Sequence, residues 1–561
     1  MKGSKKHILN KKNIIALTSI LLVILFYSVI YRDNVEIEDE DIPKSLAQIN
    51  IVEYGAIADA NFYNVIDGKY YVDASYNVMA TDNSKAFQDA IDKSSIVYVP
   101  KGNYLIEGAL SLSGEKLEII GEDKLTTKLF FTGDKISKAN TNAKNESIII
   151  NSGFDYKYDE SKAQNINIKN ISMDYIRDNN KKPNTLLLIG NINSAVFENY
   201  ISNVYNSSNI TDIGITNLDL YVACKNVNIN SSKFINDTSG PSGGCIWVRN
   251  LTTKKTNTPD NKTQSIIITN NEFIKNSKDE IIAVFSSRGD VEDVTISDNE
   301  FTTFGTIAET NISIFSAKNG FYGKVKNVII DNNKINIHDY NAFVVKVGTS
   351  SNTINPTSSV YIRNNKINVS SIKDSDRAKR IVYQADNISN NIFVENNNLE
   401  YVSSYNNKII AISCKNGSIV NNTIDGNFTI GIENGIIQKN TISGCDVGIS
   451  NPAVVEENII SNVNTGIKSI KGPVTLISKN TITLNTDLVN QNIGISIIKN
   501  FGDNSETKCA DNSVYTHNND IAYYIAKETV SFNNTNKNIG DGKYLQLSSN
   551  TTLLSLLNDL F

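Results

Sequence analysis

Apolar and polar residues alternate with a period of two through much of the chain from residue 266 onward, in short segments that are similar to one another. Each segment carries an Asn at the same place, with an apolar residue three positions before it and another two positions after it. The Asn residues in this phase are Asn271, Asn299, Asn333, Asn365, Asn397, Asn422, Asn440, Asn458, Asn480 and Asn512. Alternation of this period, rich in Ile and Val, is typical of β-strands, so each segment predicts a strand, a turn at the Asn and a second strand.

The repeat has no fixed length, because successive Asn residues of this set lie 18 to 34 positions apart. Such variation is unsuited to helical repeats but suits a parallel β-helix, in which each rung stacks on the next and loops of different length join the strands. We therefore predict an all-β, single-stranded solenoid with an apolar file inside and an Asn file at the turn. Stacked Asn amides can hydrogen-bond to one another, and an Asn at a strand end tolerates the left-handed backbone conformation.

Both ends of an open β-helix expose core and strand edges, so we expect caps. At the front, residues 83–93 place Ala86, Phe87, Ala90 and Ile91 on one face of a predicted capping helix, with Asp82 as its N-cap. At the back, residues 546–561 predict a short helical cap. Its apolar residues are Leu553, Leu554, Leu556, Leu557, Leu560 and Phe561.

Residues 14–31 form an uncharged, mostly apolar run of 18 residues, just long enough to span a bilayer as a helix. Lysines precede this run and acidic residues follow it, so the positive-inside rule keeps the N-terminus in the cytoplasm and exports the rest. No cleavage site of small residues directly follows the run, and the similar triplet Ser45-Leu46-Ala47 lies far downstream. These features predict an uncleaved signal-anchor rather than a signal peptide, and a single-pass protein of the cell membrane with an extracellular C-terminal domain.

Four segments near the front carry a more specific signature. They read INIVEYGAIADA (50–61), TDNSKAFQDAID (81–92), IVYVPKGNYLIEGALSL (96–112) and LEIIGED (117–123). In this order they resemble the N-terminal module of the pectate-lyase-like superfamily, in the branch shared by rhamnogalacturonases and epimerase-like proteins. There the segments supply the capping strand, the helix and the first coil. This chain departs from the family by the residues 61–80 between the first two segments, which we interpret as a surface loop.

The resemblance implies a right-handed parallel β-helix that acts on or binds polysaccharide. It assigns no catalytic residues, because the matching segment is structural in the family and because fold does not imply function. The chain lacks the Asn-Thr-Asp, Asp-Asp and Gly-His-Gly set of the polygalacturonase type and the Asp-Pro-His-Glu of the mannuronan-epimerase type. The predicted parts are a cytoplasmic segment and membrane anchor (1–32), an acidic stalk (33–48), the pectate-lyase-like N-terminal module (49–135), β-helix repeats (136–545) and the C-terminal cap (546–561).

Composition removes several classes of function. A net charge of −5 argues against a general nucleic-acid binder, and no basic tail offsets it. The three His are scattered and the five Cys contain no CxxC pair, so neither a metal centre built on them nor a disulfide framework is indicated. We expect the Cys residues to be buried thiols. The cysteines are Cys224, Cys245, Cys414, Cys445 and Cys509.

Five predicted strands end with a basic residue, in CIWVRN, AVFSSRG, SIFSAKNG, AFVVKVG and AISCKNG. If the rungs are in register, these cations form a stripe that can hold uronate or other anionic sugars; the alternative is solvated charges at the ends of exposed strands. An aromatic residue nearby would stack on a sugar ring. The substrate-binding residues that we predict are Arg249, Lys318, Lys346 and Tyr340, and Arg288 and Lys415 complete the stripe.

Acidic residues recur ahead of these strands, and Asp279-Glu280 is the best candidate because it lies close to the Ser286-Ser287-Arg288 turn. Paired carboxylates can act as general acid and base in hydrolysis. With a basic residue as proton acceptor they can instead support β-elimination, with Ca²⁺ bridging carboxylates to substrate. We predict Asp279, Glu280 and Arg288 as catalytic residues and name no metal ligands. The alternative is loop acids paired with nearby Lys and Arg.

Two functions follow from these observations. The first is a membrane-anchored extracellular protein that cleaves an acidic polysaccharide, as a lyase or glycoside hydrolase, or epimerises it. The second is a non-catalytic cell-surface module that binds or scaffolds glycan. The expected partners are an anionic polysaccharide and the membrane, with no nucleic acid, and the sequence leaves the oligomeric state open.

Overall fold

The computed structural model describes most of the chain from residue 47 onward, and every described residue belongs to the compact unit Ser45–Phe561. The described residues are 47–132, 137–138, 146–154, 159–177, 185–206, 214–238, 243–251, 261–276, 280–304, 310–316, 323–338, 343–348, 357–370, 379–386, 388–402, 408–470, 474–486, 492–498, 507–517, 520–525, 529–538 and 543–546. The predicted anchor (14–31) and nearly all of the predicted C-terminal cap (546–561) lie outside this set. None of the described helices is long and apolar enough to span a membrane.

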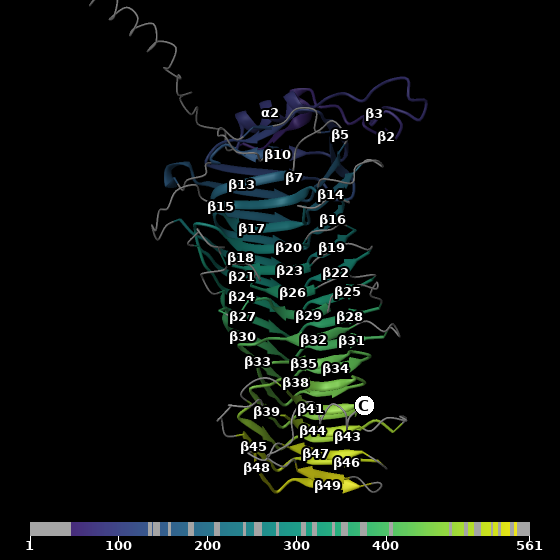
Figure 1. Cartoon of the computed structure of the whole chain (residues 1–561). Coiled ribbons are helices and arrows are strands. Elements are labelled where there is room, and N and C mark those ends of the chain that lie inside the picture. Colours follow the sequence, from purple (N-terminus) through teal and green to yellow (C-terminus); the bar gives the residue numbers. More distant parts are fainter. Residues whose placement is uncertain are drawn as a thin grey trace, which may run out of the picture. The chain divides into compact units, whose positions relative to one another are not determined.

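Three parallel strand ladders run the length of this unit, and each turn of the chain adds one strand to each of them (Figure 1). Ladder A contains β1 (Ile49–Asn50), β4 (Ile96–Val99), β7 (Lys116–Gly121), β11 (Gln164–Lys169), β13 (Thr185–Glu198), β15 (Thr216–Asn230), β18 (Thr263–Thr269), β21 (Val291–Ser297), β24 (Val325–Asp331), β27 (Ser358–Arg363), β30 (Asn390–Glu395), β33 (Gly417–Val420), β36 (Ile436–Gln438), β39 (Val454–Glu456), β42 (Leu476–Ser478), β45 (Thr507–Ala510) and β48 (Thr529–Phe532). The arrangement is a parallel β-helix, consistent with the right-handed form that the resemblance implies.

Ladder B shares the long strands β13 and β15 with ladder A, so the two ladders form one continuous sheet. Its other parallel strands are β6 (Leu110–Leu112), β10 (Glu146–Asn151), β17 (Ile246–Asn250), β20 (Ile282–Ser286), β23 (Thr310–Phe315), β26 (Phe343–Val347), β29 (Lys379–Gln384), β32 (Ile409–Ser413), β35 (Ile430–Glu433), β38 (Val447–Ser450), β41 (Thr465–Ser469), β44 (Ile493–Ile497), β47 (Ile521–Ile525) and β50 (Lys543–Gln546). A short strand, β9 (Ser137–Lys138), pairs antiparallel with β10.

Ladder C is a separate sheet. It contains β5 (Gly102–Ile106), β8 (Thr127–Phe131), β12 (Ser172–Arg177), β14 (Ile201–Asn206), β16 (Lys233–Asp237), β19 (Glu272–Lys275), β22 (Glu300–Thr303), β25 (Lys334–Ile337), β28 (Lys366–Val369), β31 (Asn398–Tyr401), β34 (Thr423–Gly426), β37 (Thr441–Ser443), β40 (Ile459–Val463), β43 (Thr481–Leu484), β46 (Ser513–Thr516) and β49 (Thr535–Asn538). The predicted strand, Asn turn and second strand correspond to a ladder A strand, the turn, and the ladder C strand that follows it.

The core lies between the ladders, because alternate residues of each strand point inward and stack on their equivalents in the next rung. The apolar residue two positions after each ladder Asn is buried, as the alternation predicts. Equivalent aromatic rings stack within this file: the centroids of Phe234 and Phe273 lie 5.3 Å apart, and those of Phe273 and Phe301 lie 4.9 Å apart. The file is therefore apolar and buried from Phe273 to Val514, although the spacing of the repeat varies.

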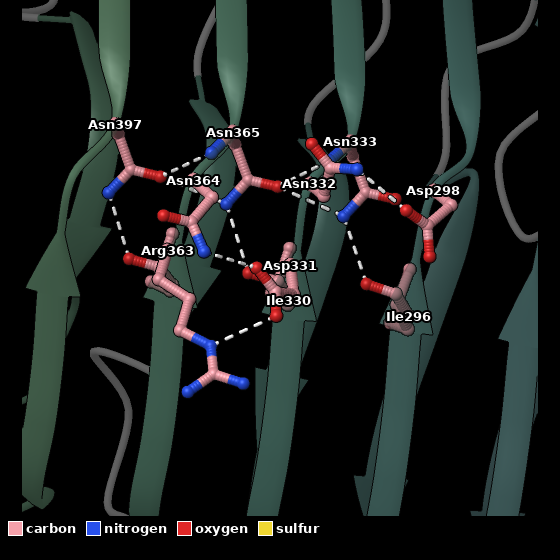
Figure 2. Close-up of polar contacts among 11 residues, drawn as sticks. Ile296, Asp298, Ile330, Asp331, Asn332, Asn333, Arg363, Asn364, Asn365 and Asn397 are labelled. Atoms are coloured by element: carbon pink, nitrogen blue, oxygen red, sulfur yellow. Dashed lines mark hydrogen bonds and ion pairs between the residues drawn. The ribbon is translucent and has the colours of Figure 1, made fainter.

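The predicted Asn file is confirmed, and Figure 2 shows three of its members. The side-chain oxygen of Asn365 accepts hydrogen bonds from the backbone N–H and from Nδ2 of Asn333, at 3.0 and 2.9 Å. Its Nδ2 donates to the backbone oxygen of Ile330 and to Oδ1 of Asn397, both at 2.9 Å. All four bonds are made by a buried amide, so the file satisfies polar groups that would otherwise be costly to bury. It also extends one rung further than predicted, to Asn534.

One detail of the turn was predicted wrongly. The left-handed conformation is adopted by the residue before each ladder Asn, with φ between 51° and 57°, and the ladder Asn is the next residue. Most of these left-handed residues are Asn or Asp, which tolerate this region best, but Lys439, Glu457 and Lys479 also adopt it. The left-handed residues are Asn270, Asp298, Asn332, Asn364, Asn396, Asn421, Lys439, Glu457, Lys479, Asp511 and Asn533.

The predicted front helix is present as α2 (Ser84–Lys93), and the residues expected on its apolar face are the ones that it buries. Asp82 is not its N-cap, because that position falls on Asn83. The Asn83 side chain binds both backbone groups of Ile57 instead. Asp82 Oδ1 accepts from the N–H groups of Ser84 and Glu107, at 2.9 and 3.0 Å. The other described helices are the 3-10 turns η1 (Ile51–Tyr54) and η2 (Glu160–Lys162).

The segment 61–80 was expected to be a surface loop, but it contains an antiparallel hairpin of β2 (Phe62–Asn64) and β3 (Lys69–Tyr71). The hairpin lies near the N-terminal end of the β-helix, beside β5 (Figure 1). Its Tyr70 ring is buried and stacks on Phe130 of ladder C, with the ring centroids 4.7 Å apart. Tyr70 is buried in one apolar cluster with Ala60, Ala80 and Leu105, and this cluster holds the hairpin against β5.

The five cysteines are buried free thiols, as expected. Burial raises the pKa of Cys245, Cys414 and Cys509 to about 12, which lowers the thiolate fraction roughly 1,000-fold. We therefore expect a thiol reagent such as DTNB to react with the native protein only as fast as it unfolds, and with all five thiols in denaturant. Rapid release of one or more equivalents from the native protein, measured by absorbance, would contradict this burial.

Candidate functional site

The outward-facing positions of ladder B bring together side chains from rungs far apart in the sequence. Trp247 pairs with Ala283, which pairs with Ser313, and the file continues through Lys346, Tyr383, Ser413 and Glu433. We call this row of residues the ladder B face. Since parallel strands lie about 4.8 Å apart, it offers a side chain at each such interval along the β-helix.

One end of the ladder B face is organised around a buried ion pair. Arg249 donates through Nε to Asp219 Oδ1 at 2.7 Å and through Nη2 to Asp219 Oδ2. The guanidinium lies over the rings of Tyr221 and Trp247, 4.3 and 4.7 Å from their centroids. Phe285 adds a third ring at 5.6 Å. We call these five residues the Arg249 cluster.

Burial dominates the electrostatics of this cluster. Asp219 is fully buried and Arg249 is 7% exposed. Burial raises the pKa of Asp219, and the adjacent guanidinium of Arg249 opposes that rise. The bidentate hydrogen bonds and the aromatic walls hold the two side chains together away from water. Arg249 is thus occupied by Asp219 and is not a cation available to a ligand.

A second group of residues lies further along the same face and is more accessible. The rings of Phe343 and Tyr383 stack with centroids 4.9 Å apart and planes 14° from parallel. Arg380 lies 4.7 Å from the Tyr383 centroid, and Lys346 Nζ lies 5.5 Å from the Phe343 centroid. Arg380 Nε is 3.7 Å from Glu433 Oε2. We call these five residues the Tyr383 cluster; all of them are half-buried.

This arrangement combines an aromatic platform with charged groups at its edges. Within the described residues, Arg380 Nε has no hydrogen-bond partner, although it is close to Glu433. Glu433 Oε2 is positioned by Ser413, whose hydroxyl donates to it at 2.9 Å. A flat apolar surface with a few fixed polar groups is the general design of a site that binds a polyhydroxylated or anionic ring.

The predicted basic stripe does not form a single file. Arg249 pairs with Phe285, and Arg288 lies three residues further on, in the turn after β20. Lys346 pairs with Ser313 and Tyr383, in a different file from Arg249. The basic residues of the stripe therefore occupy different register positions in successive strands. Lys415 is exposed beyond the end of β32, and Lys318 and Tyr340 lie outside the described residues.

The predicted catalytic residues are not brought together where they can be described. Glu280 precedes β20 and Arg288 follows it. The five-residue strand between them is roughly 13 Å long at the usual rise. Both are half-buried, and Asp279 lies outside the described residues. Among the described residues, no group of three His, Cys, Asp or Glu side chains is arranged to hold a metal ion. The catalytic roles, and Ca²⁺ as the cofactor of a β-elimination, remain predictions.

The residues that the sequence did not single out are Asp219, Arg380, Tyr383 and Glu433. Asp219 stands as a lone acid in the apolar run NLDLYVAC, a pattern that indicates a buried partner. FVVKV and KRIVYQ both place a charged and an aromatic residue three positions apart. That signal is weak without the register, which only the pairing of β26 with β29 supplies.

No protein-family model matches this chain, and no curated protein matches its sequence. Among solved structures it is similar to the Streptococcus pneumoniae surface protein and adhesin PfbA, with 14% identity, a TM-score of 0.40 and coverage of 89% of this chain and 99% of that one. It is also similar to a Yersinia enterocolitica family 28 exopolygalacturonase, with 14% identity, a TM-score of 0.42 and coverage of 79% of each chain. A third is the Azotobacter vinelandii mannuronan C-5 epimerase AlgE6 A-module, with 12% identity, a TM-score of 0.37 and coverage of 86% and 99%. These likenesses concern the β-helix fold alone.

Proposed function

We propose that this protein binds an acidic polysaccharide along the ladder B face, with the Tyr383 cluster as the principal contact. The observation that carries the proposal is the stacked pair of Phe343 and Tyr383 with a cation beside each ring. A pyranose ring can lie on the aromatic surface while its carboxylate reaches Lys346 or Arg380. Charge-assisted hydrogen bonds to a carboxylate are about twice as strong as neutral ones, and Arg can form them bidentately.

The shape of the face fits an extended chain better than a single sugar. The file of Lys346 and Tyr383 continues through Ser413 and Glu433 and then to Ser450 and Lys468. Lys468 thus repeats a cation on the same face several rungs away. A polymer lying along the β-helix would meet these groups in succession, and many weak contacts would add up to useful affinity.

Substitution of the Tyr383 cluster tests the proposal. We expect Tyr383→Ala and Lys346→Ala each to weaken binding of oligogalacturonate or oligomannuronate roughly tenfold, the loss of one good contact. Added salt should weaken binding to the unsubstituted protein, because the cations are partly exposed. Isothermal titration calorimetry with acidic and neutral oligosaccharides measures both effects.

Ladder A supplies a matched control for that experiment. Tyr361 and Phe393 form an equivalent stacked pair there, with centroids 4.9 Å apart and planes 9° from parallel. Tyr361→Ala removes the same kind of ring from a different face and should leave affinity unchanged, as should Lys366→Ala on ladder C. Equal losses in all four variants would place the binding elsewhere.

Cleavage or epimerisation of the bound polysaccharide is the more specific function expected from the sequence, and it rests on Asp279, Glu280 and Arg288. The protein would be incubated with the same acidic polysaccharides. Unsaturated-uronate absorbance then detects a lyase, new reducing ends detect a hydrolase, and a changed sugar composition detects an epimerase. Binding without any product supports the binding module. The anchor at residues 14–31 would hold either form of the protein at the cell membrane, with the β-helix outside.

A further inference from the structure

The hairpin of β2 and β3 creates a second candidate site on a different side of the β-helix. Its Tyr63 and Tyr70 rings lie 4.9 Å apart, and Tyr70 stacks on Phe130, an outward-facing residue of ladder C. Tyr70 is only 4% exposed. The hairpin therefore covers the first rungs of ladder C and leaves the following rungs beside an aromatic wall.

Polar side chains stand directly next to that wall. Phe130 pairs in register with Asp174, and Asp174 pairs with Asn203. Two positions further along the same strands, Tyr205 pairs with Asp237 on the same outward face. Strands β12 and β14 thus place a carboxyl, an amide and a phenol at the foot of the hairpin, and β16 adds the carboxyl of Asp237.

The hydrogen bonds in this group are incomplete. Asp174 Oδ1 accepts from Asn203 Nδ2 at 2.5 Å and from the Ser172 hydroxyl at 3.1 Å. Among the described residues, Asp174 Oδ2 accepts no hydrogen bond, and the hydroxyls of Tyr70 and Tyr205 have no partner either. Asn203 Oδ1 is buried without a partner among them. A buried acceptor without a partner is costly unless another molecule or water satisfies it, and this cost applies to Asn203 Oδ1.

The charge of Asp174 affects the pKa values of the two nearby tyrosines. Burial raises the pKa of Asp174, opposed by its bonds to Asn203 and Ser172 and by nearby Lys128. Burial and the charge of Asp174 raise the pKa of Tyr70 and Tyr205, the latter to about 12. Both phenols therefore stay protonated at neutral pH and present O–H donors beside the unpaired carboxyl oxygen.

We propose that Tyr70, Asp174, Asn203 and Tyr205, which we call the hairpin site, bind a neutral sugar unit through its hydroxyl groups. A sugar hydroxyl can donate to Asp174 Oδ2 and accept from a tyrosine O–H, which matches the unpaired groups of the site. A uronate would instead be repelled by Asp174 and Asp237, because neither carboxyl is neutralised by a salt bridge among the described residues. The ligand class thus differs from that of the Tyr383 cluster, and the proposal does not depend on it.

Binding of neutral trisaccharides to the full-length protein tests the site. Cellotriose, maltotriose, chitotriose and mannotriose would be titrated by calorimetry beside trigalacturonate. At least one neutral sugar should bind, and Asp174→Asn should weaken that binding about tenfold, as expected for loss of a hydrogen bond to a charged acceptor. Tyr70→Phe and Tyr205→Phe keep the ring packing and should each weaken it severalfold.

The matched control is Asp425→Asn, which changes an exposed acid in the same outward file of ladder C, far from the hairpin. It should leave all affinities unchanged, and Asp174→Asn should leave trigalacturonate binding unchanged. If Asp174→Asn fails to fold, the two Tyr→Phe variants decide the matter. The proposal is overturned if no neutral sugar binds, or if one binds equally well to all three hairpin-site variants.

Discussion

Replacing Asp219 with Ala should lower the free energy of unfolding by roughly 3–5 kcal/mol, the usual cost of leaving one member of a buried ion pair without its partner. In the substituted protein the Arg249 guanidinium stays among Tyr221, Trp247 and Phe285, with no carboxylate to balance it. The lone Trp of the chain lies in this cluster, so urea unfolding followed by Trp247 fluorescence reports on the site directly.

Two further variants distinguish the cost of burying an unpaired charge from the cost of losing an ion-pair contact. Asp219→Leu combined with Arg249→Met replaces the pair by apolar side chains, and it should recover most of the stability, since such replacements are often neutral. Arg363→Ala breaks the Asp331–Arg363 pair on ladder A, which is 3.0 Å long and has an Arg363 side chain 41% exposed, and should cost less than about 1 kcal/mol. A double variant as unstable as Asp219→Ala would show that charge burial is not the cause.

Replacing Asn397 with Ala should destabilise the protein by roughly 3 kcal/mol, because the change breaks four hydrogen bonds inside the structure. Asn397 is 1% exposed; its Oδ1 accepts from the N–H and Nδ2 of Asn365, and its Nδ2 donates to Ile362 and Asn422. Ala leaves the Asn365 N–H buried without a partner. The measurement is the shift in the urea midpoint of unfolding.

The neighbouring Asn398 provides the control. It is the first residue of β31, its side chain is exposed, and it makes no side-chain hydrogen bond within the described structure. Asn398→Ala should change stability by no more than about 0.5 kcal/mol. Equal effects at the two adjacent positions would mean that the Asn file contributes little to stability.

The sequence predicted ladders A and C well because each of their strands stands at a fixed distance from a marker. The Asn turn joins the two, and both flanking residues are inward-facing and apolar, so period-two alternation is visible from Asn271 to Asn512. The pattern does not predict Asn534 as a member of the file, because the residue two positions after it is Asn536 and not an apolar residue. The left-handed residue was assigned one position too late, since Asn is abundant at both places.

Ladder B carries no such marker, and this is why the site was only partly predicted. Segments of variable length join its strands to the other two ladders, so the position of an outward-facing residue cannot be counted from the Asn. The basic residues seemed to align, yet Arg249 pairs with Phe285, three positions before Arg288. The Tyr383 cluster exists only once β26, β29 and β35 are stacked, and the hairpin site only once residues 61–80 fold over ladder C.

The Asn file also determines which insertions and deletions the fold can tolerate. Each ladder Asn bonds to the Asn of the next rung and to the backbone of an earlier one, whether 18 residues separate it from its successor, as for Asn422, or 34, as for Asn299. Insertions and deletions between strands therefore leave the contacts of the file intact, and a whole rung can be duplicated or lost as a unit. Such a chain can lengthen, shorten and acquire new loops over generations while every remaining turn keeps the same bonds.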